Sequence, residues 1–273
     1  MSENKNGVQP PPPILHIGRE EIKPGKSFAH EKIETAWTQA LVKARYTQSF
    51  LAAESITGPS EVLWFYGYPT MEAFETDYKM ENSTPAMQTI AMQYGPSEAD
   101  VVAGTGDTLS RYREDLSYGA PINIGEYHYV SITTYRVRPG HNNDFAELMK
   151  TANEARKNGN STTHIAVYQV TSGAPSGTFL VITPRKSLAE IGQMNPAMTQ
   201  AMNDVENKLT ELTEKAVNSS SNAIYAFNAR MSKPTEEQAK ADPAFWKPKM
   251  TMAKAAPSET PGAKSTAAKQ NKP

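Results

Sequence analysis

The sequence predicts an α+β fold that contains two similar units, each with the element order β-α-β-β-α-β. The prediction rests on a repeat at a constant offset and on the pattern of apolar residues within each copy. The turn Pro24-Gly25 returns as Pro139-Gly140, and 139 minus 24 gives an offset of 115 residues. The same offset relates residues 64–69 to 179–184 and residues 112–117 to 227–232. A repeat of this length suits a small domain that was once half of a homodimer.

The elements of the first unit follow from apolar spacing and turn residues. Residues 14–22 alternate apolar and polar side chains as a half-buried strand does, and Pro24-Gly25 ends it. Ser27 can then begin a helix with apolar residues at helical spacing: Ile33, Trp37, Ala40, Leu41 and Ala44. Two further strands are expected at 50–56 and 62–68, two helices within 70–93, and a last strand at 109–116.

The second unit is expected to repeat this order, with strands at 127–137, 164–171, 178–183 and 223–231 and a helix at 142–157. Its last helix carries apolar residues at steps of four and three, namely Met198, Met202, Val205, Leu209, Leu212 and Ala216. Such a stripe is typical of a helix that packs on a sheet, and less often of a partner-binding surface. The order of elements in both units is that of a ferredoxin-like split unit.

The two ends of the chain have a different composition. Residues 1–13 contain a proline run, which predicts a disordered arm, because proline supports neither helix nor ladder. Residues 247–273 are rich in Lys, Ala and Pro and have little to bury, which predicts a disordered tail. The two folded repeats are then expected at 14–120 and 121–246.

Composition argues against several functional classes. The 28 basic and 29 acidic residues give a net charge of −1, so no charge excess indicates binding to nucleic acid or to an anionic membrane. The absence of cysteine excludes disulfides, thiolate metal ligands and a cysteine nucleophile. No segment approaches the roughly 20 apolar residues of a membrane span, and no apolar secretory segment is present. We expect a cytoplasmic protein, although an exported form without its signal would look the same; the oligomeric state stays open.

Two ferredoxin-like units with a Pro-Gly turn after the first strand resemble the dimeric α+β barrel superfamily. This superfamily includes proteins similar to antibiotic-biosynthesis monooxygenases, to EthD and to NIPSNAP. The resemblance covers nearly all of residues 14–232 and implies a single-chain, pseudo-dimeric α+β barrel with helices outside. It also implies ligands inside the barrel or between sheet and helices. It implies no particular reaction, because the superfamily contains monooxygenases, isomerases and haem enzymes.

Strand periodicity separates the side chains of each strand into two faces. Leu15 and Ile17 match Val130 and Ile132, which predicts that these residues pack on the helices. The opposite face is then expected to line the barrel lumen. It carries acids, arginines and aromatics from the first unit and mostly neutral polar groups from the second: His16, Glu20, Glu54, Trp64, Tyr66, Arg111 and Arg113, with Tyr135, Gln169, Asn228 and Arg230.

This asymmetry makes a pocket in the first unit the candidate site. His16 is the candidate base, and Arg111 and Arg113 are candidates to stabilise an anion. The remaining candidates would bind the ligand: Glu20, Glu54, Trp64, Tyr66, Tyr135, Gln169 and Arg230. Buried charges that only pair with one another in a packed barrel would explain the same pattern without a ligand.

No metal and no cofactor are expected from the sequence. The five histidines lie on different expected elements and form no spaced metal motif. A haem protein similar to chlorite dismutases is an alternative that would need an axial histidine in the second unit. His164 is the nearest candidate for that role.

The expected function is the binding of a small aromatic or enolic molecule, with cofactor-independent monooxygenation or isomerisation as the reaction. Two alternatives stay open. One is a non-catalytic interaction protein with a packed barrel, whose proline arm and tail make the contacts; the other is a haem-binding barrel. A closed lumen without a cavity near about 300 Å³ would favour the interaction protein.

Overall fold

A computed structural model describes residues 7–247 of the chain. The first half contains β1 (Ile14–Ile22), α1 (Ser27–Lys43), β2 (Phe50–Ser55), β3 (Glu61–Tyr68), α2 (Met71–Ser83), α3 (Pro85–Ala99) and β4 (Val102–Tyr112). The second half contains β5 (Tyr129–Val137), α4 (Asn142–Asn158), β6 (Ala166–Ser172), β7 (Thr178–Arg185), α5 (Pro196–Asn203), α6 (Glu206–Ala216) and β8 (Val217–Lys233). Two short helices follow, α7 (Glu236–Ala241) and α8 (Pro243–Trp246).

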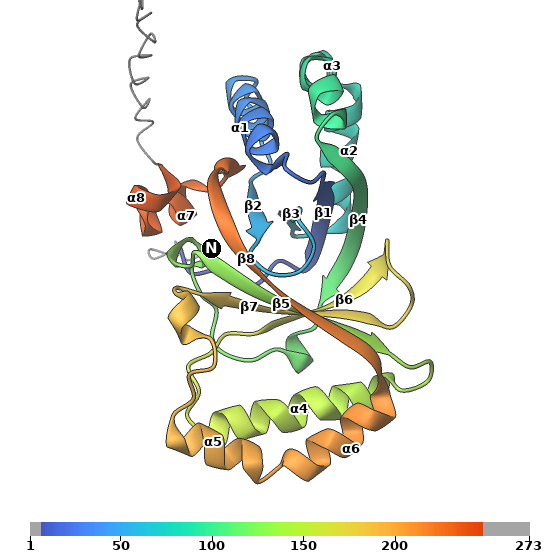
Figure 1. Cartoon of the computed structure of the whole chain (residues 1–273), viewed down its shortest axis with the longest axis vertical. Helices are drawn as coiled ribbons and strands as arrows, with labels where there is room; N and C mark the ends of the chain where they lie inside the picture. Colours follow the sequence, from blue (N-terminus) through green and yellow to red (C-terminus); the bar gives the residue numbers. More distant parts are fainter. Residues whose placement is uncertain (1–6, 248–273) are drawn as a thin grey trace, which may run out of the picture.

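The strands form one closed antiparallel barrel in the order β1-β3-β2-β8-β5-β7-β6-β4. Each half contributes four neighbouring strands in the same order, β4-β1-β3-β2 and β8-β5-β7-β6. The ring closes where β2 pairs with β8 and β4 pairs with β6. Helices α1–α3 lie on one side of the barrel and α4–α6 on the opposite side (Figure 1). The predicted α+β fold, with two ferredoxin-like units in a single-chain barrel, is confirmed.

The two halves can be compared residue by residue. The bounds of β5 and α4 lie 115 residues after those of β1 and α1, since 129 minus 14 and 142 minus 27 both give 115. This is the offset of the sequence repeat, so equivalent positions in the two halves are known for these elements. That the halves arose by duplication stays an interpretation.

Several elements differ from their expected bounds, among them α3, which ends at Ala99, six residues after the expected end at residue 93. β4 begins at Val102 and β8 at Val217, six or seven residues before the expected starts. The early residues of β8, 218–222, have exposed side chains, so they lack the apolar alternation on which the prediction depends. The long last helix is divided into α5 and α6 at Asp204 and Val205.

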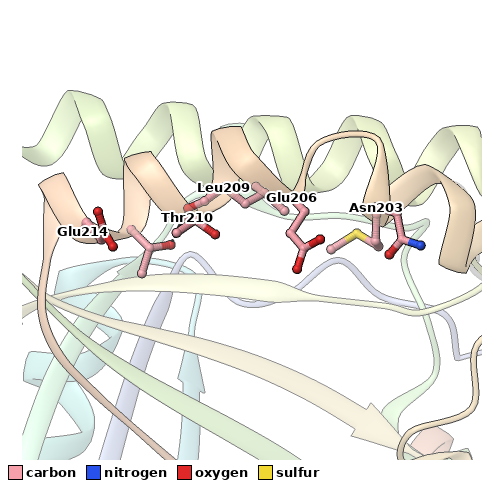
Figure 2. Close-up of a pocket in the computed structure, with 7 residues that line it drawn as sticks. Asn203, Glu206, Leu209, Thr210 and Glu214 are labelled. Atoms are coloured by element: carbon pink, nitrogen blue, oxygen red, sulfur yellow. Dashed lines mark hydrogen bonds between the residues drawn. The ribbon is translucent and has the colours of Figure 1, made fainter.

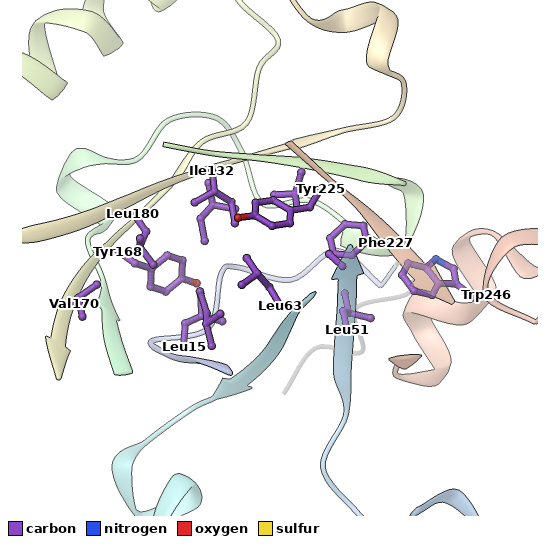
Figure 3. Packing of buried hydrophobic residues seen from close by; sticks show 14 of the residues in the cluster. Leu15, Leu51, Leu63, Ile132, Tyr168, Val170, Leu180, Tyr225, Phe227 and Trp246 are labelled. Carbon is purple, nitrogen blue, oxygen red and sulfur yellow. The ribbon is translucent and has the colours of Figure 1, made fainter. Parts of the chain in front are cut away.

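The barrel lumen is packed with apolar side chains from both halves (Figure 3). The buried cluster includes Leu15, Ile17 and Leu63 from the first half, and Val130, Ile132 and Leu180 from the second. The predicted assignment of the faces was therefore wrong. Leu15, Ile17, Val130 and Ile132 point into the barrel, and the polar face of β1 points toward the helices. A closed lumen excludes water, so apolar packing there is favoured over unpaired polar groups.

Residues 7–13, expected to be disordered, lie against the barrel. Gln9 forms a bridge with Ile122, and the carbonyl of Pro12 accepts a hydrogen bond from Tyr168 Oη at 3.1 Å. The backbone N–H of Tyr112 donates to the carbonyl of Pro13 at 3.0 Å. These extended prolines keep their carbonyls available as acceptors, which explains how the segment is held without secondary structure. The expected arm over 1–6 and tail over 248–273 lie outside the described residues.

Helices α7 and α8 cover one end of the barrel core. Trp246 is 4% exposed and belongs to the lumen cluster, where its ring lies 6.0 Å from that of Phe227. Its indole N–H donates to the carbonyl of Gly125 at 2.7 Å. A Cβ at Gly125 would lie 2.2 Å from the carbonyl oxygen of Gln238, so this close approach requires glycine. None of the described helices is long and apolar enough to cross a membrane.

Candidate functional site

A cavity of about 590 Å³ lies in the first half, between the outer face of the sheet and helices α1–α3. Its lining combines aromatic rings with six acidic residues: Glu20, Glu34, Asp77, Glu81, Glu98 and Asp107. No lysine or arginine lines it within the described part of the chain. The cavity is thus aromatic and strongly acidic.

Strand register explains why the polar residues of β1 meet in this cavity. Residues 16, 18 and 20 share the face opposite to Leu15 and Ile17. Their cross-strand neighbours lie on the same face, because His16 pairs with Tyr66 and Gly18 pairs with both Trp64 and Asp107. Gly18 has no side chain in the middle of the face, where a Cβ would lie 3.5 Å from Asp107 Oδ1 and 3.6 Å from Trp64 Cβ.

Helix α1 presents polar residues to the sheet. Its buried residues are His30, Glu34 and Thr38, which lie four residues apart and therefore share one face. The apolar stripe expected for this helix is only partly buried; Trp37 and Leu41 border the cavity. The buried face of α1 is thus polar where a packing helix would be apolar.

His16 is held beside the cavity by a carboxylate and by aromatic rings. Its Nε2 lies 2.8 Å from Oδ1 of Asp107, and its side chain is 22% exposed. The ring stacks on Tyr66 at 5.5 Å between centroids and meets the edge of Phe74 at 5.6 Å. A carboxylate on one ring nitrogen orients an imidazole and leaves the other ring nitrogen available. His16 can therefore accept a proton from a molecule in the cavity.

A buried cluster of acids and one histidine lies deeper in the same cavity. Nε2 of His30 lies 2.7 Å from Oε2 of Glu20, and His30 is 1% exposed. Burial raises the pKa of Glu34 to about 9, with the carboxylates of Glu20 and Glu98 adding to the shift. Burial also raises the pKa of Glu98 to about 7, with Glu20 again contributing. These carboxyl groups hold protons near neutral pH because they lie close together with little water.

Tyrosine hydroxyls bind the carboxylates at the other end of the cavity. Tyr46 Oη donates to Glu81 Oε1 at 2.6 Å and also lies 3.0 Å from Asp77 Oδ2, and Tyr68 Oη donates to Asp77 Oδ2 at 2.6 Å. Burial, followed by these hydrogen bonds, raises the pKa of both phenols. The phenols stay protonated and act as donors that neutralise part of the acidic charge.

The elevated pKa values predict that stability falls as pH rises. Glu34 has a pKa of about 9 when folded and about 4.5 when unfolded, so between these values the folded chain binds the extra proton. The stabilisation that this proton gives the folded state is fully present below about pH 4.5 and is lost as pH rises through about 9. Glu98 adds a similar stabilisation, which is lost as pH rises through about 7. Urea unfolding from pH 5 to 9 in metal-free buffer measures it. Glu34→Gln should flatten the fall, and a wild-type stability that rises over this range would contradict the assignment.

The other sequence candidates lie elsewhere. Glu54 accepts from Asn228 at 2.9 Å, and Asn228 also donates to Glu31, which pairs with Arg230 at 2.6 Å. These four residues form a separate polar group beside the β2–β8 junction. Of the predicted set, the structure therefore brings together His16, Glu20, Trp64 and Tyr66, but not Glu54 or Arg230.

The two arginines do not line the cavity. Arg111 is exposed and pairs in register with Ile14, at the opposite end of β1 from Glu20. Arg113 donates to Asp115 at 2.8 Å and to Gln169 at 3.0 Å. The prediction that Arg111, Arg113 and Gln169 share a lumen with His16 was wrong, because these residues follow the outer face of the barrel to its far end.

In the second half, the space between the sheet and the helices is filled with apolar side chains. The positions 115 residues after Glu20, His30 and Glu34 are Tyr135, Phe145 and Met149. Phe145 is fully buried, 4.6 Å from the ring of Phe179 and 5.3 Å from that of Tyr135. The candidate ligand-binding residue Tyr135 is thus part of a packed core.

This packed layer does not fit a haem. A haem in the second unit would need the space that Phe145 and Phe179 occupy. The candidate axial ligand, His164, lies before β6 with its Nδ1 2.9 Å from the carbonyl of Ala120, and its ring meets the edge of Tyr127. His164 is therefore fixed by contacts with neighbouring loops and does not face an open pocket.

A second concavity, of about 390 Å³, runs along α5 and α6 (Figure 2). Glu206, Leu209, Thr210 and Glu214 line it from α6, and Met202 and Asn203 line it from the preceding helix. All the described residues that line this groove come from these two helices. It is a surface groove without a converging set of polar groups, so it is not a candidate site.

Sequence reasoning missed the buried cluster around His30 and Glu34. No spaced metal motif was expected around the five histidines, but this helix carries one histidine and one glutamate four residues apart. That spacing places both side chains on one helical face. It is the signal that could have identified the pair.

Comparisons with known proteins identify the fold. No protein-family model and no curated protein matches the chain. An anthrone oxidase-like protein is 10% identical, with 78% of this chain and 90% of that chain covered and a TM-score of 0.52. A Fusobacterium nucleatum protein whose name reads "putative monooxygenase" is 13% identical, with 80% and 94% covered and a TM-score of 0.51. With the closed barrel and its two matching halves, these similarities show that the chain has the fold of the dimeric α+β barrel superfamily.

Proposed function

We propose that the first-half cavity binds a small aromatic molecule that is neutral or positively charged, and that His16 acts as a base toward it. The observation that carries the proposal is the position of the His16 ring, which lines the cavity, stacks on Tyr66 and is held by Asp107 at 2.8 Å.

The lining favours aromatic and cationic groups over anions. Trp37, Trp64, Tyr66 and Phe74 provide rings for stacking, and the faces of such rings also attract cations. Six acidic residues and the lack of any lysine or arginine among the described lining residues disfavour an anion. The arginines once expected to hold an anionic group do not contribute.

Proton abstraction from a neutral phenol or enol fits this charge distribution. The proton moves to a ring nitrogen of His16, and the new imidazolium is the positive charge beside the substrate anion. Asp107 stabilises the imidazolium. Two neighbours of the same fold are named "putative monooxygenase" and "anthrone oxidase-like", which supports assaying oxidation of an activated aromatic ring first.

The lumen is packed, as expected for the alternative, a non-catalytic interaction protein. The cavity under α1–α3 argues against that alternative, because its volume of about 590 Å³ exceeds the about 300 Å³ at which ligand pockets begin. The binding function therefore has the stronger support.

Binding is tested with three probes of similar size, benzyl alcohol, benzylamine and benzoate. Trp37 and Trp64 line the cavity, so their fluorescence should change with benzylamine and benzyl alcohol and much less with benzoate. Gly18→Val should narrow the cavity beside Trp64 and Asp107 and weaken the response. Gly106→Val is the matched control on β4, because a Cβ there meets nothing within 4 Å. Equal affinity for benzoate, or an unchanged response in Gly18→Val, would contradict the proposal.

The role of His16 is tested once a substrate turns over. His16→Ala should lower kcat by at least about 100-fold, the usual contribution of a positioned base. Probe binding should persist, because the aromatic lining is intact. Full turnover by His16→Ala would remove the assignment of His16 as the base.

A further inference from the structure

Glu20, His30 and Glu34 converge from two elements on one buried point. One side-chain ligand atom from each residue lies within 4.8 Å of the others. Glu20 comes from β1, and His30 and Glu34 come from successive turns of α1. The carboxyl group of Glu98 in α3 lies near Glu20, whose charge contributes to the raised pKa of Glu98.

Two buried polar atoms of this cluster have no hydrogen-bond partner among residues 7–247. They are Oε1 of Glu34, which is 6% exposed as a residue, and Nδ1 of His30, which is 1% exposed. Leaving a buried acceptor unsatisfied is costly, and a carboxyl group among other carboxylates has no cation to offset its charge. A cation between these groups would satisfy Glu34 and whichever ring nitrogen of His30 faces it.

The second half shows that the fold does not need polar residues at these positions. It has Tyr135, Phe145 and Met149 at the equivalent sites, and Phe145 and Met149 are buried in a tight apolar core. The first half therefore carries an unfavourable buried cluster at positions that apolar residues can fill. Such a cluster indicates a binding role rather than a packing role.

We propose that Glu20, His30 and Glu34, with Glu98 beside them, bind a divalent first-row transition-metal ion. One imidazole nitrogen with two or three carboxylate oxygens is a donor set of the kind found for Mn²⁺, Fe²⁺ and Zn²⁺. In the structure a 2.7 Å hydrogen bond between His30 Nε2 and Glu20 Oε2 holds two of these groups together. Metal binding would release any protons that these ligands carry, since the ligands bind in their deprotonated forms.

The position of the cluster links the ion to the cavity. The wall of the cavity includes Glu20, Glu34 and Glu98. His30 lies behind them and is almost fully buried. An ion held there would have protein ligands on one side and the cavity on the other, as metal sites with an open coordination position do. The metal proposal does not depend on an aromatic ligand, and each can fail separately.

The experiment is a titration of the chelator-treated full-length protein with Mn²⁺ and, separately, Zn²⁺, followed by calorimetry and by Mn²⁺ electron paramagnetic resonance. We expect one ion per chain, proton release, a higher Tm, and ¹⁴N coupling from an imidazole. His30→Phe and Glu34→Met introduce the residues of the second half and should weaken binding by at least about 100-fold while circular dichroism shows a folded protein.

A matched control separates this cluster from surface acids. His141 and Asp144 also form a 2.8 Å contact, but at the exposed start of α4, so Asp144→Asn should leave the titration unchanged. If the His30→Phe and Glu34→Met variants unfold, the presence or absence of ¹⁴N coupling to Mn²⁺ in the wild-type protein tests the proposal instead. Unchanged binding in folded His30→Phe, or bound Mn²⁺ without nitrogen coupling, would overturn the proposal, as would no binding by either ion.

Discussion

Trp246→Ala is expected to lower the free energy of unfolding by about 3–5 kcal/mol, the usual cost of truncating a large buried aromatic residue. Trp246 is 4% exposed at the end of the barrel, in contact with the rings of Phe227 and Phe245. Its removal opens one end of a lumen whose packing joins both halves. Equilibrium urea unfolding measures the change.

Trp246→Phe is the matched control for this prediction. It keeps an aromatic ring in the site and removes the hydrogen bond to the carbonyl of Gly125, so we expect a smaller loss, of about 1–2 kcal/mol. If both variants are as stable as the wild type, α8 does not close the barrel, and the described packing at this end is wrong.

Glu34→Met is expected to raise the free energy of unfolding by about 1–3 kcal/mol at pH 8, because the wild-type protein buries an unpartnered carboxyl group that must also take up a proton on folding. The substitution removes a carboxyl whose burial raises its pKa to about 9, and it introduces the residue found at the equivalent position 149. The gain should shrink toward pH 5, because the unfolded-state pKa of Glu34 is about 4.5 and the free-energy cost of protonating this carboxyl on folding falls as the pH approaches that value. Unfolding in metal-free buffer at the two pH values measures it.

The reciprocal change, Met149→Glu, is the control in the other half. Met149 is 4% exposed in an apolar core, so a carboxyl group there should destabilise the protein strongly. A destabilising Glu34→Met would show instead that Glu34 contributes to packing, and the functional interpretation of the buried cluster would lose its main support.

The architecture could be predicted from the sequence because it depends on features that are local or repeated. The Pro-Gly turn and the 115-residue offset predicted β1, α1, β5 and α4 within a few residues of their observed bounds. Polar strand ends such as residues 218–222 were missed because exposed side chains leave no alternation of hydropathy.

The site could be predicted only in part. Alternation shows which residues share a face of a strand, but not which face lies inside a barrel whose strands are covered on both sides. His16, Glu20, Trp64 and Tyr66 were correctly grouped but were assigned to the lumen, whereas they face α1–α3. His30 and Glu34 belong to a helix, and their approach to Glu20 depends on tertiary packing.

Anomalous diffraction from a crystal soaked in Mn²⁺ tests most directly whether the helix–sheet layer of the first half is the binding site. We predict an anomalous peak between the side chains of Glu20, His30 and Glu34, and no corresponding peak beside Phe145 in the second half. A soaked crystal with Mn²⁺ only at surface carboxylates, or with none, would contradict the assignment of this cluster as a metal site.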